Sequence, residues 1–377
     1  MGNLLRRWFG GVRVVLILLI AFESMGRSNG HLPVSGLFIL GDSSVNCGNN
    51  LFFPSLPFSL VDTSFLLLCN TTLVPDLLAK KLALRPVPPF SGQSENVGRA
   101  MQGLNFGVPS ATILTSGDLD YVSLKQQIRY ALNTLQNFDL ALGRRRARRL
   151  ISSSIFYLSM GAHDYTDLYY PDIYVAGSRH PEFAHILVGE VTRAMKDLYH
   201  ANVRKIIVAG IGPLGCAPRF LSESDPDSIN STNGGIKCED QLNDMIQEYN
   251  TALSLALKNL SSELPHLRIT FCDVYKGLMK MISNPQPYGF KIVNKACCGV
   301  ENYGGWDECG AKEPMCEDPS THVWWDGYNP SEGANHLLAD WVWSGGPLGI
   351  CSPMKFQQLA ATSSLMIVQQ PEDWQDP

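Results

Sequence analysis

Short apolar runs alternate with longer segments of helical periodicity along most of this chain. Four runs are expected to be buried strands because they are short and rich in branched or aromatic residues: Gly36–Leu40, Ser152–Met160, Val203–Ala209 and Leu267–Val274. Four segments between and beside them are expected to be helices: Val74–Leu84, Ser123–Leu142, Glu182–His200 and Cys238–Leu264. A short strand-like stretch, Val323–Asp326, then precedes a last helix at Pro330–Trp343, with Pro330 at its start.

This alternation implies parallel βαβ units. We therefore expect an α/β fold with three α/β/α layers and a central, mainly parallel sheet of about five strands. The sequence holds no internal repeat and no clear linker, so residues 31–350 are predicted to form a single domain and residues 351–377 a C-terminal tail.

The first 30 residues have the pattern of a secretory signal peptide. Arg6, Arg7 and Arg13 precede the apolar run Val14–Phe22, and small residues follow. The run is too short to span a bilayer, although an uncleaved signal anchor is the alternative. No later segment is apolar and long enough to cross a membrane. The predicted location is therefore secreted, extracellular or in the cell wall.

Composition and cysteine content agree with this location. The 377 residues are 45% hydrophobic and carry a net charge of −5, which gives no reason to expect nucleic acid as a partner. In an oxidising compartment ten cysteines indicate disulfides, and a zinc site among Cys297, Cys298, Cys309 and Cys316 is disfavoured because no CxxC pair is present. Acceptor triplets for N-glycans begin at Asn70, Asn230 and Asn259.

One run of like charge stands out, formed by the arginines at 144, 145, 146, 148 and 149. It is interpreted as a solvated helix end or loop, with a protease-sensitive site or an anionic-polymer contact as alternatives.

Three polar clusters fall at or near predicted strand ends, where doubly wound folds bind ligands. They are Gly41–Ser43, Gly161–Asp164 and Asp326–Asn329. A serine just past a strand can expose its hydroxyl while backbone N–H groups hold a developing oxyanion. Their joint placement predicts a site built around Ser43.

Six blocks resemble, in order, those of the plant-type GDSL esterase/lipase family, also called SGNH hydrolases. They are Leu37–Asn50 (LFILGDSSVNCGNN), Asn105–Leu114 (NFGVPSATIL), Leu158–Tyr165 (LSMGAHDY), Gly210–Pro218 (GIGPLGCAP), Ala296–Gly299 (ACCG) and Val323–Asn335 (VWWDGYNPSEGAN). The resemblance implies a flavodoxin-like domain, no metal or organic cofactor, and an ester substrate such as a lipid acyl ester or an acetylated polysaccharide.

The resemblance also implies a role for each matching residue. Ser43 is the nucleophile, Asp326 the orienting carboxylate, and Asn329 stands where the family has its histidine. The oxyanion hole maps to Ser43, Ser110 and His163, of which His163 stands where the family has asparagine. Pro109 offers no N–H, Asn46 replaces the usual aspartate of the first block, and residues 59–68 replace the usual segment after it.

A carboxamide cannot take the proton of Ser43, so a conventional triad cannot be assembled. The expected function is ester hydrolysis with weakened or rewired catalysis, in which His163 is the candidate substitute base. Alternatively His163 only donates a hydrogen bond, and His322 and His336 are expected to be ordinary edge or surface residues. A catalytically inactive secreted protein that binds an acyl chain or glycan is the competing function, and a decaying gene is a third possibility.

Overall fold

The computed structural model describes residues 34–46, 49, 72–90, 97–114, 122–169, 182–224, 237–298 and 315–362. The predicted signal peptide, the unusual segment at 59–68, and the acceptor asparagines Asn70 and Asn230 lie outside these residues. In the part of the chain that is described, every helix is too short or too polar to cross a membrane.

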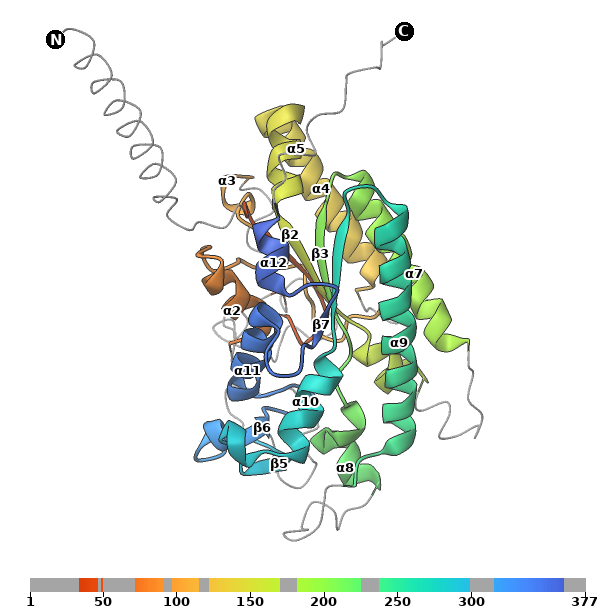
Figure 1. The fold of residues 1–377 in the computed structure, drawn as a ribbon, viewed down its shortest axis with the longest axis vertical. Helices are drawn as coiled ribbons and strands as arrows, with labels where there is room; N and C mark the ends of the chain where they lie inside the picture. The colour runs from red at the N-terminus through yellow and green to blue at the C-terminus, as the bar shows by residue number, and fades with distance from the viewer. Residues whose placement is uncertain are drawn as a thin grey trace, which may run out of the picture. The chain divides into compact units, whose positions relative to one another are not determined.

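A five-stranded sheet forms the centre of the fold, in the order β1-β2-β3-β4-β7 (Figure 1). Its strands are β1 (Leu37–Gly41), β2 (Ile155–Ser159), β3 (Lys205–Ala209), β4 (Arg268–Cys272) and β7 (Cys351–Ser352). The first four pair in parallel and in regular register, whereas β7 pairs antiparallel with β4. The predicted mainly parallel sheet is confirmed.

The other edge of β1 carries a sixth, irregular chain segment. Leu37 and Ile39 donate backbone hydrogen bonds to Gln102 and Leu104, and Phe106 donates back to Ile39. This segment runs parallel to β1. It therefore lies beside the first strand on the side away from β2, the strand arrangement of flavodoxin-like folds.

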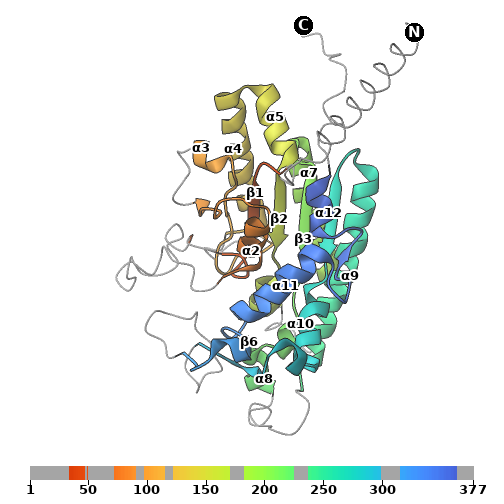
Figure 2. The same ribbon diagram turned by 60° about the vertical axis from the view of Figure 1, so that its left-hand side comes forward.

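Helices cover both faces of the sheet, which gives the three predicted layers (Figures 1 and 2). One layer consists of α4 (Leu124–Leu142), α5 (Arg144–Ser153), α7 (Phe183–His200) and α9 (Asp240–Glu263). The other consists of α2 (Val74–Lys81), α10 (Val274–Ser283), α11 (Glu332–Ser344) and α12 (Phe356–Ala361). The short helix α3 (Val97–Ala100) contacts α4, and the short helix α8 (Pro218–Ser224) contacts strand β5 (Ile292–Ala296).

A separate two-stranded parallel sheet is made by β5 (Ile292–Ala296) and β6 (His322–Trp324). The predicted strand at Val323–Asp326 thus begins and ends earlier and does not join the central sheet. Asp326 instead follows β6 in a loop whose backbone carbonyl at Asn329 accepts from the Trp325 N–H.

Three predicted boundaries are corrected by local structure. Ser152 and Ser153 end α5 and do not begin β2, and both hydroxyls donate to carbonyls of that helix. Val274 begins α10, because Asp273 caps that helix through the N–H of Lys276. Helix α11 begins at Glu332, after the N-cap Ser331, so Pro330 lies outside it.

The arginine run occupies the start of α5, where all five side chains are exposed. This confirms a solvated helix end, although the helix itself was not predicted.

The segment assigned to the tail contains packed structure. Phe356, Leu359 and Ala360 of α12 are buried, and the ammonium of Lys205 donates to the Ala360 carbonyl at 3.3 Å. A disulfide joins Cys272 of β4 to Cys351 of β7. The folded chain therefore continues past residue 350 to the end of α12.

Two further disulfides join described residues, Cys216–Cys238 and Cys297–Cys316. The prediction of disulfides over a zinc site is confirmed for Cys297 and Cys316.

Candidate active site

Ser43 lies in a tight turn directly after β1, which is closed by a hydrogen bond from the Val45 N–H to the Asp42 carbonyl. The turn follows Gly41, the last residue of β1, where a Cβ atom would clash with the Ser159 carbonyl. The buried amide of Gln127 on α4 donates to the Gly41 carbonyl and accepts from its N–H, both at 2.8 Å. The nucleophile candidate is therefore held on a rigid support.

The hydroxyl of Ser43 donates to Asn329 Oδ1 at 3.3 Å. Asn329 in turn donates from Nδ2 to Asp326 Oδ2 at 3.0 Å. These three side chains form one line in which a carboxamide lies between the hydroxyl and the carboxylate. An amide oxygen accepts a hydrogen bond but has no useful basicity, so the line as it stands cannot deprotonate Ser43.

Asp326 also shapes the loop that carries Asn329. Its Oδ1 accepts from the backbone N–H groups of Tyr328 at 2.8 Å and Asn329 at 2.6 Å. Burial raises the pKa of Asp326 above the ordinary value, and these hydrogen bonds together with the nearby charge of His163 oppose the rise. The carboxylate is therefore tied to loop geometry as well as to the Asn329 side chain.

His163 lies just after β2 and has a carboxylate partner four residues later. Its Nδ1 lies 2.9 Å from Asp167 Oδ2. His163 lies directly before a π-helical segment, η3 (Asp164–Tyr169), and Asp167 lies within that segment. Asp167 Oδ1 accepts from the Thr166 hydroxyl at 2.7 Å, which fixes the carboxylate. The side chain of His163 is only 12% exposed.

The surroundings of His163 favour its charged form. Burial, the largest influence, lowers the pKa of His163, but the hydrogen bond and charge of Asp167, with the charges of Asp42 and Asp164, outweigh it and raise the pKa. Burial alone would raise the pKa of Asp167, yet its interactions with His163, Thr166 and Arg219 lower it. The two groups thus stabilise each other as an ion pair.

Asp164, which follows His163 in the sequence, binds a neighbouring backbone segment. Its two carboxylate oxygens accept from the backbone N–H groups of Ile113 at 2.7 Å and Leu114 at 3.0 Å. Burial raises the pKa of Asp164 to about 7, despite those hydrogen bonds. Asp164 therefore holds the backbone at Ile113 and Leu114, and the carboxylate that contacts His163 is Asp167.

One cavity gathers the polar candidates at the carboxyl ends of the strands. Its polar lining includes Ser43, Ser44, His163, Thr166, Tyr328 and Asn329. Its apolar lining includes Met160, Ile211, Leu214, Val274, Leu278 and Trp324. The loop after β3 is held by Asn250, whose buried amide bonds both backbone groups of Ile211. The cavity thus places an apolar wall beside a serine hydroxyl and an imidazole.

The structure brings together Ser43, His163 and Asn329, with Asp326 directly behind Asn329. Ser110 is not among the residues that line the cavity, and its φ of +53° belongs to a separate turn. Asp167 was missed by sequence reasoning. Its spacing of four from His163 was the available signal, but it is informative only if that segment is helical.

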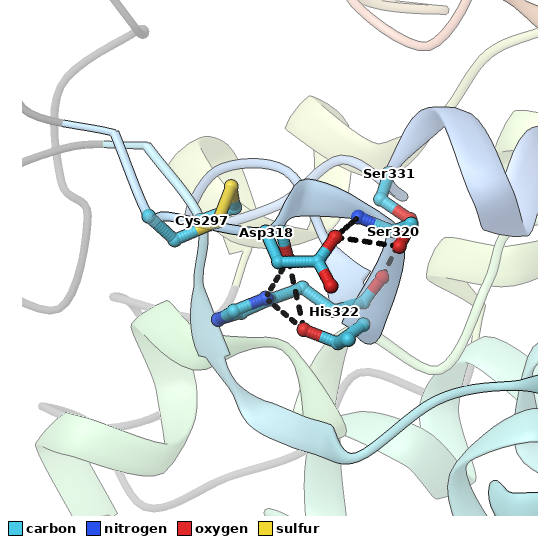
Figure 3. Close-up of a disulfide and its surroundings, with 7 residues drawn as sticks. Cys297, Asp318, Ser320, His322 and Ser331 are labelled. Carbon is cyan, nitrogen blue, oxygen red and sulfur yellow. Dashed lines mark hydrogen bonds between the residues drawn. A yellow bond between two sulfur atoms is a disulfide. The ribbon is translucent and has the colours of Figure 1, made fainter.

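The other two histidines considered as bases lie elsewhere. His336 is exposed on α11, 3.7 Å from Glu332. His322 is buried beside the Cys297–Cys316 disulfide, where its Nδ1 contacts the Asp318 carbonyl and the Thr321 hydroxyl (Figure 3). The two sulfurs and a ring nitrogen of His322 lie within 4.8 Å of one another. Because the sulfurs are bonded to each other, no thiolate is available there to bind a metal ion.

Comparison with known proteins identifies the wider group. The family described as GDSL-like Lipase/Acylhydrolase matches residues 37–342. GDSL esterase/lipase At1g33811 of Arabidopsis thaliana is 32% identical over 359 residues, which cover 88% of this chain and 94% of the relative. GDSL esterase/lipase At1g71250 of the same plant is 28% identical over 369 residues, covering 93% and 96%. This chain therefore belongs to the GDSL-like lipase/acylhydrolase family.

Proposed function

We propose that this protein hydrolyses carboxylic esters of acyl or acetyl groups, with Ser43 as the nucleophile. Family membership supports ester hydrolysis as the reaction. The position of Ser43, on a hydrogen-bonded turn that lines the cavity, supports its role as the nucleophile. The reaction forms an acyl-enzyme on the serine oxygen, which water then cleaves.

The single observation that carries the proposal is the line from Ser43 through Asn329 to Asp326. It has the order of a nucleophile, a middle group and an orienting carboxylate, with Asn329 at the position that the family resemblance gives to the histidine. Since removal of a triad member costs roughly 10⁴ to 10⁶ in rate, catalysis through this line alone would be weak. Weakened or rewired catalysis is therefore part of the proposal.

The oxyanion is proposed to be held by the backbone N–H of Ser43, as at other serine hydrolase sites. The family pattern adds Ser110 and His163 as further candidates. Of these two, only His163 lines the cavity.

The apolar wall of the cavity favours an acyl chain as the substrate's acid portion. Lipid acyl esters and acetylated polysaccharides are the two substrate classes to compare. A preference for p-nitrophenyl butyrate over p-nitrophenyl acetate would favour the lipid class, and the opposite preference would favour acetyl esters.

Secretion to the extracellular space or cell wall is proposed with this activity. Disulfides are typical of oxidising compartments, and the sequence begins with a signal-peptide pattern. Asn259 is exposed on α9, so a glycan there would meet no packing obstacle within the described fold. Peptide mapping of secreted protein would test cleavage near residue 30 and occupancy at Asn70, Asn230 and Asn259.

A catalytically inactive protein that binds an acyl chain or glycan is the second candidate, favoured by the carboxamide at position 329. The two candidates separate on one comparison. Purified protein and Ser43→Ala are assayed with p-nitrophenyl acetate and butyrate. Ester hydrolysis requires turnover that is lost in Ser43→Ala, whereas equal background rates would leave only the binding protein.

A further inference from the structure

We propose that His163 is the general base for Ser43 and that Asp167 is the positioning residue that orients it. The base would then lie on the turn after β2 and not on the loop after β6. This inference rests on the proposed ester hydrolysis at Ser43. It adds a residue, Asp167, and assigns His163 to proton transfer in place of oxyanion binding.

The contact with Asp167 fixes which ring nitrogen of His163 can act as a base. A carboxylate only accepts hydrogen bonds, so Nδ1 of neutral His163 must carry its proton toward Asp167 Oδ2. Nε2 is then the unprotonated nitrogen, and the ring borders the same cavity as Ser43. The Thr166 hydroxyl holds the other carboxylate oxygen, so the orientation does not depend on one contact.

The charges around His163 suit a group that gains a proton during the reaction. Asp167 pairs with the ring, and the carboxylates of Asp42, Asp164 and Asp326 lie near enough to interact with its charge. Arg219 is the opposing cation, and it acts on Asp167. Acidic groups therefore outnumber basic ones around the imidazole, which lowers the cost of forming an imidazolium.

The two departures from the family pattern are reciprocal. Histidine stands at 163, where the resemblance implies asparagine, and asparagine stands at 329, where it implies histidine. Each side chain contacts a carboxylate of its own, Asp167 for His163 and Asp326 for Asn329. The cavity thus keeps one imidazole and one carboxamide, with their positions exchanged. If the site were simply losing its function, an orienting carboxylate beside the new histidine would not be expected.

The proposed reaction consumes only the ester and one water molecule. The Ser43 hydroxyl turns from Asn329 Oδ1 toward His163 Nε2, and its proton moves to Nε2. Its oxygen bonds to the ester carbonyl carbon, while the π bond of the carbonyl breaks and its electron pair moves onto the carbonyl oxygen. On collapse of the tetrahedral intermediate the C–O bond to the alcohol breaks, and His163 returns the proton to the leaving oxygen. Water repeats the sequence on the acyl-enzyme and releases the acid.

The test compares full-length secreted protein with His163→Gln, Asp167→Asn and Ser43→Ala, using p-nitrophenyl acetate across a pH series. His336→Gln is the matched control, because this exposed histidine lies on α11 away from the cavity lining. Thermal unfolding of each variant shows that it is folded. For His163→Ala, added imidazole is tested as a replacement base.

We expect His163→Gln to lower kcat about 100-fold or more, the usual range for loss of a general base. Asp167→Asn should lower kcat by less, because the imidazole remains but loses the carboxylate that orients it. Asp167→Asn should also move the pH profile to lower pH, and imidazole should partly restore His163→Ala. If His163→Gln and Asp167→Asn keep kcat within about twofold while Ser43→Ala loses activity, this inference is wrong and the proposed function stands. If the wild-type protein is no faster than Ser43→Ala, both this inference and the proposed ester hydrolysis are wrong.

Discussion

The Ser43 hydroxyl donates its hydrogen bond to the amide oxygen of Asn329 across 3.3 Å. The contact keeps the geometry in which a serine hydrolase would hold its nucleophile against an imidazole, but it removes the basicity. The side chain that restores an imidazole to the cavity is His163, on a different loop. Catalysis by Ser43 therefore depends on proton transfer to His163, because Asn329 cannot accept the proton.

Reversing the exchange gives the most specific mutational prediction. His163→Asn combined with Asn329→His should raise kcat/KM at least about 10-fold above wild type, since a base would then lie between Ser43 and Asp326. Activity of this double variant should no longer depend on Asp167. Asn329→Gln, which adds no base, is the control and should give no gain. Steady-state kinetics with p-nitrophenyl acetate measures each effect.

The pH dependence of activity follows from the raised pKa of His163. Only the neutral imidazole accepts a proton, so kcat/KM should rise with pH through an apparent pKa above the ordinary 6.5. A profile that is flat from pH 6 to pH 9 would exclude an imidazole base.

The stability of the folded protein should decrease as pH rises, whereas its activity should increase. Because the folded pKa of His163 lies above its unfolded value, the His163–Asp167 pair contributes fully below about pH 6.5 and loses its contribution as pH rises through the folded pKa. Denaturant unfolding just above pH 6.5 should show this decline, and His163→Gln should lessen it. An equal decline in both proteins would assign it to other groups.

Asp326 is predicted to matter for folding as well as for chemistry. Asp326→Ala removes the acceptor for two backbone N–H groups and the Asn329 amide, so the free energy of unfolding should fall by about 1–3 kcal/mol. Asp326→Asn keeps one acceptor oxygen and should cost less. Chemical denaturation distinguishes the two, and equal losses would show that the hydrogen bonds to the loop are not the cause.

The disulfide between Cys272 and Cys351 should stabilise the fold more than that between Cys216 and Cys238. The first closes a loop of 79 residues and the second a loop of 22. Loop-closure entropy corresponds to about 4 and about 3 kcal/mol respectively. Paired Cys→Ser variants measured by denaturation test this order, and a larger loss at Cys216–Cys238 would contradict it.

Local patterns were sufficient to predict the parallel core. The runs at β1 and β3 are short, apolar and followed by glycine, so their period and length identify them with little competition from other structures. The predicted start of β2 is too early because helix α5 was not recognised. The arginines of α5 surround Ala147 and Ile151, so the helical spacing of these two buried residues does not stand out in the sequence.

The other differences between the predicted and the observed structure arise from contacts between residues that are far apart in the sequence. A three-residue strand such as β6 carries no sign of its partner, so its pairing with β5 could not be read from the sequence. Strands β4 and β7 pair antiparallel and are joined by a disulfide between cysteines 79 residues apart, a separation too long for local patterns to reveal. For the site, the clusters around Ser43, His163 and Asn329 were predicted to meet, whereas Asp167 required knowing that its segment is helical.

Covalent labelling of Ser43 reports whether its hydroxyl is activated by His163. Secreted protein is treated with a fluorophosphonate, and intact mass followed by peptide mapping locates the adduct. We expect one adduct per chain on Ser43, formed faster as pH rises and at least about 10-fold more slowly in His163→Gln. No adduct on Ser43 in folded wild-type protein, or equal labelling of the Ser43→Ala variant, would contradict it.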